Sequence, residues 1–138
     1  MGGELNGPSI GGIFTVVGFA AFGKHIKNIT PVLVGIFLIG AINPYELKST
    51  FAVLAALFGT TLAPINGYYG PIAGVIAGVL HMAMVMNVGY LHAGMNLYNN
   101  GFSGGFVAAG LIPVFECFIP YLRGKRKKSC ISEQEETP

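Results

Sequence analysis

The sequence predicts an all-α fold, an integral membrane helical bundle of about five apolar segments, from its hydropathy and from the placement of its charges. Hydrophobic residues make up 52% of the 138 residues and charged residues 10%, whereas an average soluble domain is roughly 25% charged. Of the fourteen charged residues, eight lie after residue 122, which leaves six for the preceding chain. Six charges cannot form the polar shell of a soluble domain this large, so we expect lipid to cover most of the surface.

Glycine, proline, asparagine and charged residues separate these apolar segments, which are 8–23, 31–43, 51–65, 71–92 and 106–122. A bilayer core of about 30 Å needs about 20 helical residues, and only the fourth segment is comfortably that long. The shorter segments are therefore predicted to be short, tilted helices or broken and re-entrant segments. Re-entrant segments survive at membrane depth only where protein or water surrounds them.

The last sixteen residues, 123–138, form a tail that is first basic and then acidic. This pattern predicts a disordered cytoplasmic segment that follows a membrane domain at 1–122. The RGKRKK run directly follows an apolar segment, as positive-inside topology requires, so nucleic acid is not an expected partner. Counting back through five crossings from a cytoplasmic tail also places Lys24 and Lys27 in the cytoplasm, and this agreement favours an odd number of crossings.

The longest segment carries glycines at a helix-packing spacing and a histidine near its centre. Gly70, Gly74 and Gly78 form two GxxxG steps, which let another helix backbone approach closely. The same glycine face would equally make room for a solute. His81 lies near the middle of the segment, where ionisable residues are functional candidates, although a hydrogen-bonded packing histidine fits the same pattern.

Two stretches rich in hydrogen-bonding groups flank that segment. In GTTLAPINGYYGP, Pro64 is predicted to break the helix and Asn66–Gly67 is a turn signal. The second stretch is HAGMNLYNNGFSGG, which interleaves apolar residues with amides and small polar groups. Each stretch is either an ordinary loop or a broken helix whose polar groups line a solute path. In the second interpretation, the path is lined by Thr60, Thr61, His92, Asn96, Asn99, Asn100 and Ser103.

The sequence contains no set of side chains for catalysis or metal binding, so neither an enzyme nor a cofactor is predicted. His81 and His92 are about 16 Å apart along one helix face, too far for one metal ion. No nucleophile has an adjacent base. Amides and hydroxyls instead suit a small polar solute or an ion. Glu116, about 9 Å inside the last segment, and His81 are candidates for proton-linked sites or for structural roles.

Three motifs resemble a known family: GFAAFGKHIKN, FGTTLAPINGYYG and LHAGMNLYNNGFSGGF. Together they are similar to the C-terminal half of domain-of-unknown-function family 1576, which comprises uncharacterised bacterial multi-spanning membrane proteins. The resemblance implies a bacterial cytoplasmic (inner) membrane and a longer protein, of which this chain is a fragment or a split half. It implies no activity, because the family has none assigned.

The sequence therefore predicts a component of a membrane transporter or channel for a small polar solute or ion. Five short segments are few for enclosing a pathway, so we expect a homo-oligomer or a larger assembly that includes a missing N-terminal half. The alternative is a non-transporting membrane scaffold or assembly subunit, in which the polar stretches cap helices and join them. The lipid bilayer is the partner that both functions require.

Overall fold

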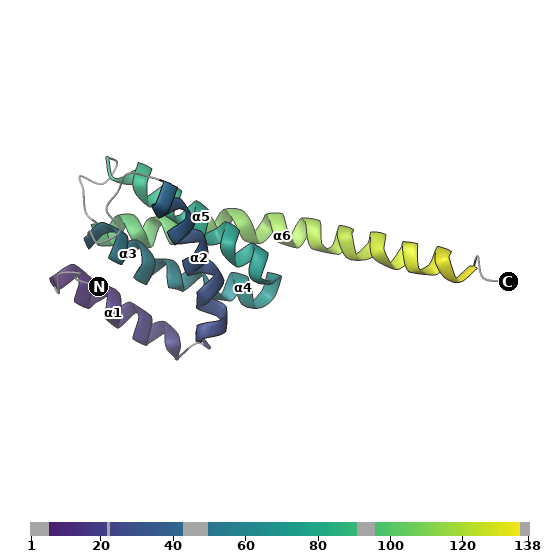
Figure 1. Ribbon diagram of the computed structural model, residues 1–138, viewed down its shortest axis with the longest axis horizontal. Helices are drawn as coiled ribbons and strands as arrows, with labels where there is room; N and C mark the ends of the chain where they lie inside the picture. The colour runs from purple at the N-terminus through teal and green to yellow at the C-terminus, as the bar shows by residue number, and fades with distance from the viewer. Residues whose placement is uncertain (1–5, 22, 43–49, 91–95, 136–138) are drawn as a thin grey trace. The chain divides into compact units, whose positions relative to one another are not determined.

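The structure is a computed structural model that describes residues 6–21, 23–42, 50–90 and 96–135, with side chains from 98 to 118 on the last stretch. These residues form helices joined by short turns and include no strand, which confirms the predicted all-α bundle. The chain forms two compact units, Met1–Ala108 and Ala109–Pro138. Figure 1 labels the helices α1 (Gly7–Ala20), α2 (Ile26–Ile42), α3 (Thr50–Gly59), α4 (Ala63–Tyr69), α5 (Pro71–Val88) and α6 (Asn96–Glu135).

Among the described helices, α1, with 14 residues, and α2, with 17, are apolar but short for a membrane, whereas other stretches match its thickness. Three stretches are long and apolar enough to cross it: Thr50–Tyr69, Pro71–Val88 and Tyr98–Phe118. The first has 20 residues and the second 18, which correspond to about 30 Å and 27 Å. Exposed tyrosines lie beyond both ends of α5, as in the aromatic belts of membrane proteins, with Tyr68 85% and Tyr90 82% exposed.

The first of these stretches continues past residue 65, where the sequence predicts its apolar segment to end. Thr60–Leu62 forms a 3₁₀ turn, η1, that joins α3 directly to α4. Both threonine hydroxyls of η1 donate to backbone carbonyls one turn earlier, which satisfies them inside the helix. Pro64 lies in the first turn of α4, where a missing N–H costs little, so the α-helix is interrupted just before it, as predicted, while the apolar stretch continues to Tyr69.

The predicted turn at Asn66–Gly67 is wrong, because both residues lie inside α4. Nδ2 of Asn66 donates to the carbonyls of Lys27 and Asn28, at 3.1 Å each. This tertiary contact uses the amide that a local turn would have used. The chain instead reverses at Gly70, whose φ of +91° lies in the left-handed region that favours glycine.

The glycines of α5 have two different roles. A Cβ on Gly78 would overlap the backbone of Val32 in α2, and a Cβ on Gly74 would lie 2.8 Å from Cβ of Asn66. These two glycines therefore provide the close helix packing that the GxxxG spacing predicts. Gly70 does not join them, since a Cβ there would meet nothing within 4 Å. Its role is the turn between α4 and α5.

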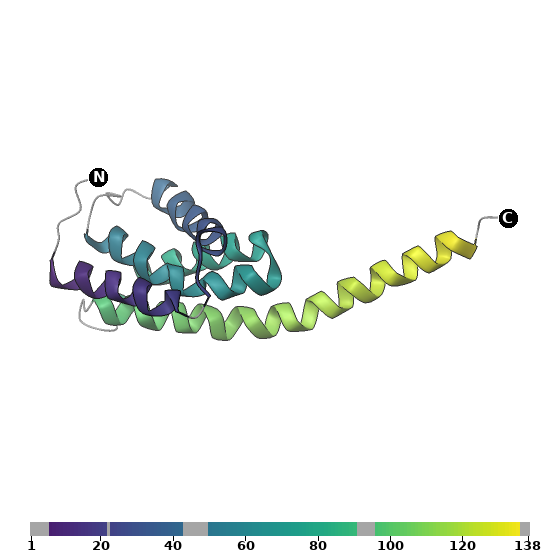
Figure 2. The same cartoon turned by 90° about the horizontal axis from the view of Figure 1, so that it is seen from below.

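A hydrogen bond joins the residue that precedes α1 to the first residue of α3. Asn6 precedes α1 and caps it, with Oδ1 accepting a hydrogen bond from the backbone N–H of Ser9 at 3.0 Å. Nδ2 of the same side chain donates to Oγ1 of Thr50, the first residue of α3, at 3.2 Å. The two helices consequently run side by side, as Figure 2 shows.

The described part of the polar stretch, residues 96–105, is helical and forms the start of α6. This helix begins at Asn96, ten residues before the apolar segment that the sequence predicts at 106–122. Asn99 and Ser103 are one helical turn apart and are both buried, so tertiary packing supports a helix that asparagine and glycine do not favour alone. α6 ends at Glu135. The disorder and the cytoplasmic location of the 123–138 tail stay predictions.

Candidate functional site

The first unit buries polar side chains from η1, α5 and the start of α6. His81, Asn100 and Ser103 are 0% exposed, Asn99 is 1% exposed and Thr60 is 5% exposed. In a membrane protein such groups avoid lipid and face other protein groups or water. The residues that the sequence selects as path candidates therefore point into the first unit wherever their side chains are described.

The imidazole of His81 lies between two glycines. A Cβ built on Gly59, the last residue of α3, would lie 3.5 Å from Nε2. A Cβ built on Gly104 in α6 would lie 3.9 Å from Nδ1. The two ring nitrogens thus face different helices, α3 and α6, across glycines that place no side chain between those helices and the ring.

Neither nitrogen of His81 has a hydrogen-bond partner among the described residues. The backbone carbonyl of Ala55 interacts with the ring but does not meet the geometry of a hydrogen bond. Oγ of Ser103, which precedes Gly104, also has no partner in the described part of the chain. Buried polar groups are nearly always paired, so these two side chains require a ligand, a water molecule or a functional explanation.

Thr61 connects the η1 turn to the same region. Its Oγ1 would lie 3.5 Å from a Cβ on Gly104, the glycine that also borders His81. The structure thus brings one of the two predicted threonines close to the polar start of α6. Thr60 lies on the same turn and is more deeply buried.

Two cavities border Thr61. One, of about 280 Å³, lies where α1 ends and α2 begins; its lining includes Phe19, Lys24, Asn28, Thr60, Thr61 and Pro64. The other, of about 350 Å³, is lined by Thr15, Phe19, Phe58, Thr61, Leu62, Gly101, Gly104, Gly105 and Ala108. Phe19 and Thr61 therefore form a wall that the two cavities share, and Gly104 lines the second cavity close to His81.

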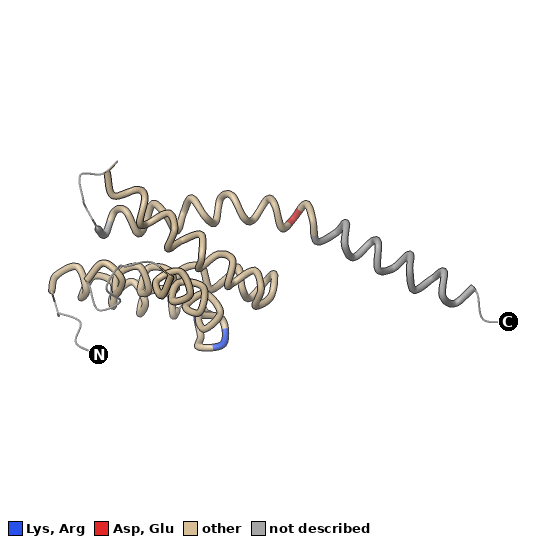
Figure 3. The backbone as a smooth tube through the Cα atoms, turned by 45° about the horizontal axis from the view of Figure 1, so that its top comes forward, with Lys and Arg blue, Asp and Glu red and all other residues tan. Residues whose placement is uncertain are grey.

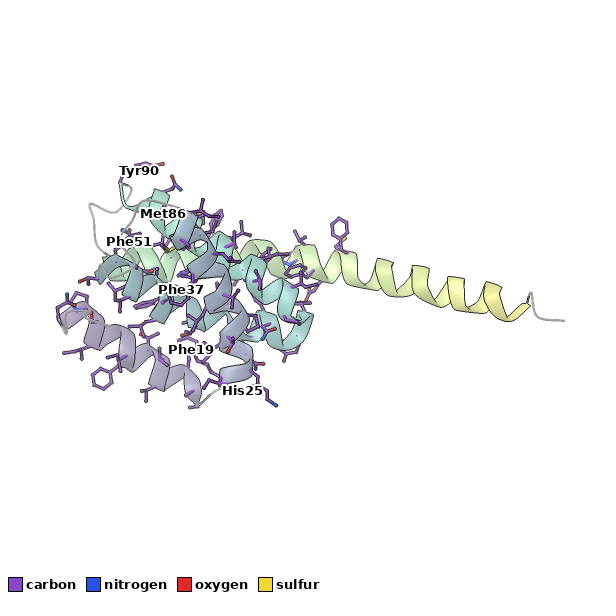
Figure 4. The ribbon with its side chains drawn as sticks, viewed as in Figure 1. Phe19, His25, Phe37, Phe51, Met86 and Tyr90 are labelled. Atoms are coloured by element: carbon purple, nitrogen blue, oxygen red, sulfur yellow. The ribbon has the colours of Figure 1, made fainter. Side chains whose placement is uncertain are left out.

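Lys24 contributes a charge to the first cavity. Its Nζ lies 5.7 Å from the ring centroid of Phe19, which Figure 4 labels near the end of α1. Partial burial lowers the pKa of Lys24, because desolvation disfavours the charged ammonium. A cationic group that faces a cavity in a membrane protein marks that cavity as a candidate binding site.

The predicted site residues did not include Lys24, Asn28 or the glycines that border His81. Lys24 and Asn28 lie in the 24–30 stretch between two apolar segments, so their position is that of an ordinary loop. Gly59 and Gly104 each lie within one of the two polar stretches. That location was the signal in the sequence that could have identified them as site residues. Their contact with one imidazole depends on how α3, α5 and α6 pack.

Three predicted site residues do not join this cluster. His92 lies outside the described residues, and Asn96 is described only as the first residue of α6. Glu116 belongs to the second unit, where its side chain is exposed. Among the described residues, no group of three or more histidine, cysteine or acidic side chains is arranged to hold a metal ion.

The fold, the helix lengths and the interior polar groups define a helical membrane protein. A family model with the description "Protein of unknown function (DUF1576)" matches residues 1–117, and the chain therefore belongs to that family. This match confirms the resemblance that the three sequence motifs carry. No curated protein and no solved structure matches the chain.

Proposed function

We propose that the chain is a component of a membrane transporter or channel for a small polar solute or ion. The solute passes Lys24 and enters the first cavity, crosses the Thr60–Thr61 turn, and reaches the second cavity beside Gly104 and His81. The observation that carries this proposal is the position of Gly104. It lines the second cavity and lies close both to Thr61, which lines the two cavities, and to His81, which is fully buried and has no hydrogen-bond partner among the described residues.

The depth of these groups supports a path rather than a packing role. His81 is near the middle of α5, a stretch long enough to cross a membrane, so its desolvation is not relieved by the membrane surface. Ser103 is also fully buried and lacks a partner among the described residues. A solute or a chain of water molecules would supply the missing hydrogen bonds.

We further propose that His81 links solute movement to protons. A histidine with two unpartnered nitrogens can accept or release a proton when a solute or water arrives beside it. Glu116 is the second proton-linked candidate, on the part of α6 in the second unit. The complete pathway requires more helices than this chain offers, which favours a homo-oligomer or additional segments of a longer protein.

The experiment compares Gly104→Ala with Gly110→Ala. Both substitutions replace a glycine of α6, so both change helix propensity equally, but a Cβ on Gly110 would meet nothing within 4 Å. On Gly104 the Cβ makes ordinary contacts with Thr61 and His81, which narrows the gap without forcing the helices apart. We expect Gly104→Ala to slow solute entry by about tenfold, the effect typical of one extra methyl group in a fitted site.

The measurement is osmotic reswelling of proteoliposomes after shrinkage in acetate, chloride, urea or glycerol, with sucrose as the impermeant control. It detects entry of whichever of these solutes the protein admits. Equal rates for the two variants would exclude the gap beside Gly104 from the path. No reswelling by the wild type in any solute would show that this chain does not form a path by itself.

The non-transporting scaffold remains the second candidate, and the hydrogen bonds of Asn66 favour it. Its amide joins α4 to the start of α2, which is the interhelical role that a scaffold needs. In a scaffold, Gly104→Ala would leave the protein unchanged apart from a small gain in helix stability. Loss of stability on Asn66→Ala is expected under both functions and does not distinguish them.

A further inference from the structure

The cavity at the start of α2 contains an ammonium group whose charge no described residue balances. Nζ of Lys24 is shielded from solvent and has no hydrogen-bond partner in the described part of the chain. The ring of Phe19, 5.7 Å away, attracts the cation but supplies no counter-charge. A shielded charge is costly unless it is paired, so a bound anion would remove a specific energetic cost at this position.

The surroundings of Lys24 add positive potential and do not neutralise it. α2 begins at Ile26 with no acidic residue in its first turn, and the N-terminus of a helix is itself positive. Lys27 lies on the same turn, and Figure 3 shows lysine in blue at this end of the first unit. Glu116 is the only acidic residue whose side chain the structure describes, and it belongs to the second unit. No described carboxylate of the first unit therefore balances the charge of Lys24.

The remaining lining of the cavity restricts the kind of anion. Asn28 contributes an amide, and Ala63 and Pro64 contribute an apolar wall. The hydroxyls of Thr60 and Thr61 donate their protons to backbone carbonyls, so toward the cavity they can only accept hydrogen bonds. A ligand that fits must combine one negative charge with an organic part.

We propose that this cavity binds a small monocarboxylate anion, with its carboxylate against Lys24 and Asn28 and its organic part against Ala63 and Pro64. The inference rests on the proposed function and names the class of solute. One ammonium balances one negative charge, so a dicarboxylate would retain an unpaired charge in a shielded site. A cavity of about 280 Å³ is at the small end of ligand sites, and a bare inorganic anion would leave the apolar wall unused.

Thermal unfolding of the detergent-purified full chain tests the proposal with acetate, butyrate and lactate, each compared with its neutral amide. We expect the midpoint temperature to rise in a saturable way with the carboxylates and to remain constant with the amides. Lys24→Gln should abolish the rise, because the amide keeps a hydrogen-bond donor but removes the charge. Lys27→Gln is the matched control, since Lys27 is exposed on the same turn, and it should retain the rise.

A second measurement uses only the wild type and so does not depend on the folding of a variant. Heat of binding is measured by isothermal titration calorimetry of the detergent-purified protein with butyrate, and butyramide is the neutral control. We expect a saturable heat with butyrate and none with butyramide. The absence of butyrate binding would overturn the proposal, and so would stabilisation by phosphate or anionic lipid without stabilisation by any monocarboxylate.

Failure of this inference is distinguishable from failure of the proposed function. Butyrate binding without reswelling of butyrate-shrunken proteoliposomes would keep the anion site and remove the transport function. Reswelling in urea or glycerol that Lys24→Gln leaves unchanged, together with no carboxylate binding, would keep transport and remove the anion site.

Discussion

His81 has a combination of properties that packing alone does not explain. It is 0% exposed, and neither of its nitrogens has a hydrogen-bond partner among the described residues. Leaving a buried polar group unpaired costs about 1–3 kcal/mol, so an apolar side chain of similar size would be favoured if stability were the only requirement. The two glycines beside the ring, Gly59 and Gly104, have no side chain that could pair with either nitrogen.

Replacement of His81 by leucine separates function from packing. Since leucine removes the unpaired nitrogens and fills most of the ring volume, we expect His81→Leu to unfold at the same temperature as the wild type or at a higher one. Solute entry in the reswelling assay should be lost, because the polar group beside the second cavity is gone.

The control for this prediction is Met82→Leu, a change of similar volume at the adjacent buried position. It should preserve both the unfolding temperature and solute entry. A His81→Leu protein that swells at the wild-type rate would contradict a role for the histidine, and one that fails to fold would instead support a packing role.

At the scale of helices, glycine determines how closely the elements of the first unit approach. A Cβ on Gly35 would overlap the carbonyl of Val75 in α5, and a Cβ on Gly78 would overlap the carbonyl of Val32 in α2. The two glycines therefore face each other across a backbone-to-backbone contact. Dispersion and close packing, not hydrophobic burial, are what hold helices together in lipid, so this contact is a main source of stability.

We expect Gly78→Ala to destabilise the protein by about 1–3 kcal/mol, the usual cost of overpacking. Its Cβ meets backbone, which cannot move aside as a flexible side chain would. The measurement is the midpoint of unfolding in a denaturing detergent titration.

Gly18→Ala provides the matched control on α1, because a Cβ there would meet nothing within 4 Å. That substitution should leave stability unchanged or raise it by up to about 1 kcal/mol through helix propensity. Equal stability of the two variants would show that α2 and α5 do not depend on the close approach at Gly78.

At the scale of the whole molecule, the connection between α1 and α2 and the connection between α4 and α5 lie at the same end of the first unit. Asn66 donates to the carbonyls of Lys27 and Asn28, so the end of α4 lies beside the start of α2. Figure 4 labels His25 at this end and Phe51 and Tyr90 at the other. In the topology predicted from the basic residues, the 24–30 loop faces the cytoplasm, and the 44–50 and 92–105 stretches face the opposite side.

Cysteine labelling tests that orientation. In a Cys117→Ser background we expect a membrane-impermeant maleimide to reach Cys130 and an introduced His25→Cys from the same side. The physical reason is that both lie in basic segments, which positive-inside topology keeps in the cytoplasm. The assay uses sealed vesicles of right-side-out and inside-out orientation.

Reaction of the two cysteines from opposite sides would contradict the four crossings predicted between residues 25 and 130. Each is best measured in a protein with a single cysteine, so the His25→Cys protein also carries Cys130→Ser. A lysed-vesicle sample, in which both positions should react fully, controls for access to the reagent.

The sequence by itself determined the class of protein, because hydropathy and charge placement are properties of composition and order alone. A mean hydropathy of +0.61, with few charges before residue 123, required lipid as the main solvent of the surface. Local sequence also determined where α1 and α5 start, because Pro8 and Pro71 occupy first-turn positions, where proline is tolerated. His81 stood out because ionisable residues at that depth are rare.

Tertiary structure decided what the polar stretches do. Asn66–Gly67 has the local preference of a turn, but hydrogen bonds from Asn66 to α2 hold it in a helix. The asparagine-rich start of α6 has weak helix propensity, and burial of Asn99 and Ser103 compensates for it. The meeting of Thr61, Gly104 and His81 joins segments that are far apart in the chain. Contacts of that kind depend on how helices pack in three dimensions, which no local sequence pattern specifies.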